Sequence, residues 1–91
     1  MLKIKDSVDL KKLRKYGFEY NVSTKNYERR IDNHWWDLII IDGEDREIYN
    51  ATEEIGRWVM CYSDDEFWEF REKYIEDLKK ANLVEDVEEI E

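Results

Sequence analysis

The chain of 91 residues contains no proline, only three glycines and a single cysteine. With so little glycine and no proline, it has no flexible linker that would separate two domains. Cys61 cannot form an internal disulfide, which is typical of a reducing cytosol. The longest apolar run, Leu38–Ile41, is too short to cross a membrane, and the charged first residues lack the apolar core of a secretory signal. We therefore expect one small cytoplasmic domain with no membrane partner.

Positive charge is also scarce. The chain has 15 Lys and Arg against 24 Asp and Glu, a formal net charge of −9. Residues 1–30 hold nine Lys and Arg against four Asp and Glu, a net of +5, whereas residues 31–91 hold six against twenty, a net of −14. This balance argues against direct binding to nucleic acid or to an anionic membrane, and it fits a basic protein partner. The alternative is that the carboxylates serve only solubility.

The best-specified stretch is Ser63–Asn82. Ser63 followed by Glu66 matches a capping box, and two favourable i,i+4 pairs follow, Glu69 with Lys73 and Glu76 with Lys80. Its apolar residues recur at helical spacing: Phe67, Phe70, Tyr74, Leu78 and Ala81. The pattern predicts one long amphipathic helix.

Alternating apolar and polar residues predict strands over 2–5, 18–22 and 27–31. The near-continuous apolar run over 35–41 predicts a strand at the centre of the sheet, and two further strands are expected over 46–50 and 57–62. A short helix is expected over Val8–Tyr16, ending at Gly17. The predicted fold is α+β: an antiparallel sheet of about four to six strands, packed by this helix and by the long C-terminal one. Residues 1–84 would form the domain, and residues 85–91 an acidic tail.

Catalytic and metal sites are poorly supported. His34 lies near Asp32 and Asp37, but it is the only histidine, and a turn histidine is the simpler interpretation. Cys61 alternates within an apolar strand, which is typical of a small buried side chain. The acids of residues 42–47 do not have the spacing of an EF-hand loop. We therefore expect no enzymatic activity, no bound metal and no cofactor.

The acidic excess suggests a protein-binding surface. Carboxylates in rows along a rigid helix can imitate a phosphate backbone and occupy a basic nucleic-acid groove. Two tryptophans could anchor such an interface, although each could equally fill the core. The predicted partner-binding residues are Asp64, Asp65, Glu69, Glu72 and Glu76 on the helix, Asp42, Glu44 and Asp45 at a hairpin tip, and Trp36 and Trp68.

Both ends of the chain resemble small uncharacterised proteins of phages and prophages of low-GC Gram-positive bacteria. Ile4–Phe18 matches their opener I-K-D-x-V-D-L-x-x-L-x-x-Y-G-F, and Asp77–Glu85 matches their closing D-L-x-x-A-x-L-V-E. The resemblance implies a phage origin. Small acidic phage proteins include inhibitors of host defence nucleases, such as anti-CRISPR proteins that mimic DNA. By analogy of size, charge and origin, we expect a non-enzymatic inhibitor of a host nucleic-acid-binding protein. The alternative is a structural or regulatory phage protein that forms homo-oligomers, for example a homodimer joined through Trp and Tyr side chains on the sheet.

Overall fold

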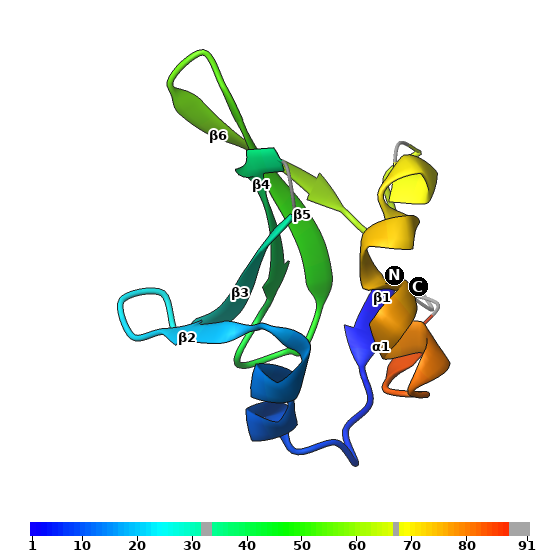
Figure 1. Ribbon diagram of the computed structural model, residues 1–91. Helices are drawn as coiled ribbons and strands as arrows, with labels where there is room; N and C mark the ends of the chain where they lie inside the picture. The colour runs from blue at the N-terminus through cyan, green and yellow to red at the C-terminus, as the bar shows by residue number, and fades with distance from the viewer. Residues whose placement is uncertain (32–33, 67, 88–91) are drawn as a thin grey trace.

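Five consecutive strands form the centre of the molecule (Figure 1). The computed structural model describes residues 1–31, 34–66 and 68–87, with the backbone alone at 34 and 35. The sheet has the order β2-β3-β4-β5-β6 and every pairing in it is antiparallel, so the chain simply runs back and forth. Its strands are β2 (Glu19–Asn21), β3 (Asn26–Ile31), β4 (His34–Ile41), β5 (Ile48–Glu54) and β6 (Arg57–Tyr62).

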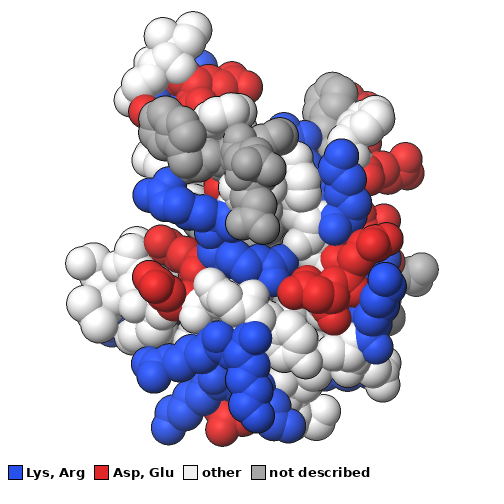
Figure 2. All heavy atoms as spheres, viewed as in Figure 1, with Lys and Arg blue, Asp and Glu red and all other residues white. Residues whose placement is uncertain are grey.

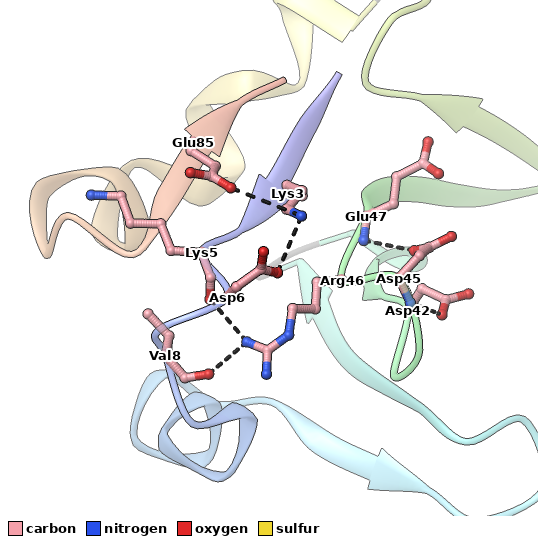
Figure 3. Close-up of polar contacts among 9 residues, drawn as sticks. All are labelled: Lys3, Lys5, Asp6, Val8, Asp42, Asp45, Arg46, Glu47 and Glu85. Carbon is pink, nitrogen blue, oxygen red and sulfur yellow. Dashed lines mark hydrogen bonds and ion pairs between the residues drawn. The ribbon is translucent and has the colours of Figure 1, made fainter. Parts of the chain in front are cut away.

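A second sheet joins the two ends of the described chain. Strand β1 (Leu2–Ile4) pairs antiparallel with β7 (Val84–Asp86), so that Leu2 lies opposite Asp86. The Lys3 ammonium lies between the carboxylates of Asp6, at 3.2 Å, and Glu85, at 3.9 Å (Figure 3). The segment that we expected to be an acidic tail therefore begins inside a strand, and residues 88–91 lie outside the described part.

One face of the large sheet is covered and carries the core. Ile39, Ile41 and Ile48 project from this inner face and are fully buried. They belong to one cluster with side chains of the N-terminal segment and of the segment after β6, namely Ile4, Leu13, Phe18, Trp68, Ile75 and Leu78. Burial of this apolar surface supplies the main stabilisation of the domain.

The predicted long C-terminal helix is wrong, and with it the predicted fold class. The chain over 63–82 forms two short 3-10 helices, η2 (Trp68–Phe70) and η3 (Glu72–Ile75), followed by the short α-helix α1 (Glu76–Lys80). Together η3 and α1 span nine residues, Glu72–Lys80. The described chain is mostly strand, and in it no helix combines the length and apolar character that a membrane span needs.

Tertiary contacts explain why the helical pattern fails. The Ser63 hydroxyl accepts a hydrogen bond from the Leu2 N–H at 2.7 Å, so it binds the N-terminal strand rather than capping a helix. Arg71, between η2 and η3, donates from Nε to the Asn50 side-chain oxygen at 2.5 Å. The buried side chains are Trp68, Ile75 and Leu78, whereas Phe70 of the predicted stripe is 70% exposed. The segment follows the shape of the sheet, because long-range packing outweighs the local helical preference.

Smaller differences have local causes. The N-terminal helix is the 3-10 helix η1 (Leu10–Tyr16), which begins two residues later than predicted, is capped by the Asp9 side chain, and ends as predicted at Gly17, whose φ is 87°. The β4–β5 connection is a wide turn, in which the Arg46 N–H donates to the Asp42 carbonyl and the Asp42 N–H to the Glu47 carbonyl. Any side chain at Gly43 would place its Cβ 2.0 Å from the Lys25 carbonyl oxygen. Strand β5 also continues to Glu54, beyond the predicted end at residue 50.

Candidate protein-binding surface

The C-terminal carboxylates lie on the layer that covers the inner face of the sheet. Asp64 and Asp65 are exposed in the turn after β6, and Glu69 and Glu76 are exposed on η2 and α1. Glu72 is only half-exposed and pairs with the Lys79 ammonium. These groups are distributed over a turn and three separate short helical segments, so they do not form the row of acids that one long helix would have presented.

The acids of the β4–β5 turn have a structural role. The Asp42 carboxylate accepts hydrogen bonds from the Glu44 N–H at 2.7 Å and from the Asp45 N–H at 3.0 Å. Asp45 in turn accepts from the Glu47 N–H at 2.8 Å (Figure 3). Such side-chain to backbone bonds are typical of turns. Glu44 is exposed on this turn. Arg46 links the turn to the N-terminal segment, because its guanidinium donates to the carbonyls of Lys5 and Val8.

The two tryptophans that we selected have opposite environments. Trp68 is 4% exposed and packs in the core, so it is not an interface anchor. Its indole N–H is buried and has no hydrogen-bond partner among the described residues. Trp36 is 39% exposed on the uncovered side of β4. Only Trp36 is therefore placed where a partner could reach it.

The uncovered side of the sheet carries a group of apolar side chains that the sequence patterns did not single out. Trp58, Met60 and Tyr62 alternate along β6 and are 45%, 42% and 45% exposed. The strand register places Tyr49 opposite Tyr62 and Ala51 opposite Met60 on the same side. We call this surface the outer aromatic face; its members are Trp36, Leu38, Ile40, Tyr49, Ala51, Trp58, Met60 and Tyr62. Along β6, the outward positions alternate with positions that face the core, so the pattern of this strand indicated a second apolar face. We did not select these residues because we expected helices to cover the sheet.

Carboxylates surround the outer aromatic face. Glu53 lies opposite Trp58, and Glu28 lies opposite Ile40, both on this side of the sheet. Asp65 accepts a hydrogen bond from the Tyr62 N–H at 3.0 Å. Arg30, opposite Leu38, is the cation that the described strands place on this face. The surface thus combines exposed aromatic rings with a local excess of negative charge.

The ionisation of Tyr49 reports this environment. Burial raises the pKa of the Tyr49 phenol, and the negative charge of Asp42 raises it further, with smaller effects of Tyr62, Glu28 and Asp45. The Tyr49 ring packs against Tyr62 with centroids 5.5 Å apart, and its oxygen accepts from the Asn26 amide at 3.4 Å. The phenol therefore loses its proton at a higher pH than an unperturbed tyrosine does.

Positive charge gathers elsewhere. Lys11, Lys12, Arg14 and Lys15 are all exposed on η1, and Figure 2 shows Lys and Arg concentrated over this part of the molecule. Among the described residues, no ion pair involves these four cations. The uneven charge of the sequence is thus not neutralised by folding, and the two regions remain electrostatically distinct.

The residues weighed as catalytic are not brought together as a site. Cys61 is buried on the inner face, and its burial raises the pKa of the thiol, with a smaller opposing effect of Arg71. The side chain of His34 lies outside the described part. Within that part, no group of three or more His, Cys, Asp or Glu lies close enough to hold a metal ion.

A groove of about 1080 Å³ runs between β3 and the C-terminal segment. Arg29 crosses it, donating to the Tyr16 and Tyr74 carbonyls and to the Asp77 carboxylate, and its guanidinium also lies 4.6 Å above the Phe18 ring. Arg29 therefore links β3 to η1 and to the C-terminal segment.

No protein family, characterised protein or solved structure shows significant similarity to this chain.

Proposed function

We propose that this chain is a non-enzymatic binding protein of phage type, which occupies a basic nucleic-acid-binding surface of a host protein in the manner of anti-CRISPR inhibitors. The observation that carries the proposal is the outer aromatic face with its surrounding carboxylates. Exposed Trp and Tyr side chains are common energetic centres of protein interfaces. Arg and Lys of a partner could stack on these rings and pair with Glu53 and Glu28.

This proposal replaces the helical row of acids with a different surface. The straight row does not exist, and Glu72 and Asp77 are already paired with Lys79 and Arg29. Acids beside aromatic rings can satisfy both the charge and the apolar stems of partner Lys and Arg side chains. The overall net charge of −9 would also accelerate association with a basic protein at low salt.

The test is affinity capture from a lysate of a low-GC Gram-positive host, followed by displacement with double-stranded DNA. Two charge reversals provide a matched pair: Glu53→Lys on the outer aromatic face and Glu76→Lys on α1 change the net charge equally. We expect a DNA-binding protein to be captured at low salt, released by DNA or by high salt, and lost with Glu53→Lys alone. Equal capture by both variants, or a captured protein that DNA does not displace, would contradict the proposal.

Self-association is the second candidate function, favoured by the same exposed rings. A homo-oligomer would bury Trp36, Trp58 and Tyr62 against a second copy. Light scattering over a range of protein concentrations separates the candidates. A mass that rises to a multiple of the chain mass, and falls back with Trp58→Ser, would support the oligomer and weaken the inhibitor proposal.

A further inference from the structure

Strand β6 is an edge strand of the five-stranded sheet. Some backbone N–H and C=O groups along its free edge make no hydrogen bond with the described residues. At Tyr62, the N–H donates to the Asp65 carboxylate and the C=O accepts from the Asp65 N–H at 2.9 Å, so both groups point away from β5. Backbone direction alternates along a strand, so the N–H and C=O of Trp58 and Met60 point the same way. Among the described residues, none makes a hydrogen bond with these four groups.

This edge lacks the usual protection. Natural edge strands are blunted by lysine, proline, a bulge or short length, because open backbone groups can pair with another chain. Strand β6 has six residues, carries a charge only at Arg57 beside the hairpin, contains no lysine or proline, and pairs with β5 in continuous register from Tyr62 to Arg57. Between Arg57 and Tyr62 the edge is therefore regular and can pair with a further strand.

The charge around the edge selects the kind of strand that could add. Residues 53–66 hold five carboxylates and one arginine. Glu53 and Glu54 stand at the hairpin end of β6, and Asp64, Asp65 and Glu66 at the other. A second copy pairing antiparallel through β6 would bring these two acidic ends against each other, which is unfavourable. A segment that carries Lys or Arg would meet opposite charge at both ends.

We propose that β6 accepts an extended, Lys- and Arg-bearing segment of the partner protein as a sixth strand of the sheet. The Trp58 and Met60 backbone groups would hydrogen-bond to the segment. Its alternate side chains would lie beside Trp58, Met60 and Tyr62, and its cations would pair with the terminal carboxylates. This is the strand-addition mode of peptide recognition. It specifies the form of the partner for the function proposed above and rests on that function.

The experiment uses the full chain and a capped peptide of about six residues that alternates Lys and Val, the usual length of a strand. Binding is followed by amide hydrogen exchange in NMR. We expect the Trp58 and Met60 amide protons to exchange rapidly in the free chain and to become protected with peptide. The Val59 and Cys61 amides, which face β5, should be protected throughout.

Two versions of the peptide, N-methylated at alternate residues in the two possible phases, test the backbone requirement. We expect one phase to bind at least about tenfold more weakly, the loss expected for about 1.4 kcal/mol of hydrogen bonding. Equal affinity of all three peptides, without protection of Trp58 and Met60, would overturn strand addition. If Glu53→Lys still abolished capture of the host protein, the proposed function would stand with a different docking mode.

Substitutions at Met60 give a matched pair on the protein side. Met60→Pro removes an N–H that the β5 ladder does not use, and proline is tolerated at such edge positions. Met60→Ala removes the side chain but keeps the N–H. We expect Met60→Pro to lose peptide binding and Met60→Ala to keep most of it. Equal effects of the two variants would overturn the proposal, as would concentration-dependent protection of Trp58 and Met60 without peptide, since a second copy would then occupy the edge.

Discussion

The two faces of the five-stranded sheet have similar apolar content but very different surroundings. On the inner face, Ile39, Ile41 and Ile48 are covered by the N-terminal segment and by η2, η3 and α1. On the outer face, Trp58, Met60 and Tyr62 remain accessible. Leaving large rings in water forgoes the stabilisation that their burial would give, about 25 cal/mol for each Å². Burial on the inner face therefore supplies most of the stability, and the accessible outer face is the surface that we propose for binding.

The largest expected effect on the free energy of unfolding comes from replacing the core tryptophan Trp68, with the outer-face tryptophan Trp58 as the comparison. Trp68→Ala should lower the free energy of unfolding by about 3–5 kcal/mol, because it leaves a cavity in the core. Trp58→Ala should lower it by less than about 1 kcal/mol, since the ring is 45% exposed. Urea denaturation of both variants measures the difference. Similar losses would show that the two faces are not distinct in stability.

Trp68→Phe sharpens the same test. It removes the buried indole N–H, which has no partner among the described residues and costs about 1–3 kcal/mol when unsatisfied. We expect this gain to offset much of the lost packing, so that Trp68→Phe lowers the free energy of unfolding by less than about 1.5 kcal/mol relative to the unsubstituted chain. A loss close to that of Trp68→Ala would contradict the prediction and would indicate that the N–H is satisfied in solution.

Arg29 is the next largest contributor on the inner side. Arg29→Met should lower the free energy of unfolding by about 3 kcal/mol, because the Asp77 carboxylate and the Tyr16 and Tyr74 carbonyls lose a shared donor. The exposed Arg14 of η1 offers a control, and Arg14→Met should change stability little. Thermal unfolding of both variants checks the prediction. Equal effects would show that the Arg29 contacts contribute nothing specific.

Alkaline pH should lower the free energy of unfolding through one ionisable group on each face of the sheet, Cys61 on the inner face and Tyr49 on the outer face. The Cys61 pKa is raised from 9.0 and the Tyr49 pKa from 10.0, both mainly by burial. The folded state therefore keeps these protons after the unfolded chain has lost them. This stabilisation is complete below pH 9 and falls as the pH rises through the folded-state values. Urea titrations across this range should show the decline, and Tyr49→Phe should reduce the part that lies above pH 10.

The smallest effect is expected at the tip of the β5–β6 hairpin. Ile55 has a φ of 50° and is fully exposed, although a branched side chain disfavours this conformation. Ile55→Asn would give Asn-Gly with Gly56, the favoured pair for such a turn. We expect the melting temperature to rise by about 5 °C, from relief of about 1 kcal/mol of strain. An unchanged melting temperature would show that the turn carries no such strain.

The sequence predicted local features better than the overall fold. Alternation located β3 closely, apolar runs located β4 and β6, and Gly17 was correctly expected to end the N-terminal helix. The long helix failed because its determinants are distant: Ser63 binds Leu2 and Arg71 binds Asn50, contacts that no local pattern contains. The outer aromatic face was missed for the same reason. Only the strand register and the missing cover on that side show that Trp58, Met60 and Tyr62 remain exposed together.

The small sheet of β1 and β7 constrains the order of assembly. It joins groups far apart in sequence, since the Met1 amino group binds the Asp86 carboxylate 85 positions away. During synthesis, β1 emerges before the five-stranded sheet, whereas its partner strand β7 emerges after that sheet. The sheet has only neighbouring pairings and can form early, whereas closure of the β1–β7 contact is intrinsically slow. Strand β1 is therefore synthesised before the sheet but reaches its place after it, and until then the core side chains Leu2 and Ile4 stay accessible to chaperones and proteases.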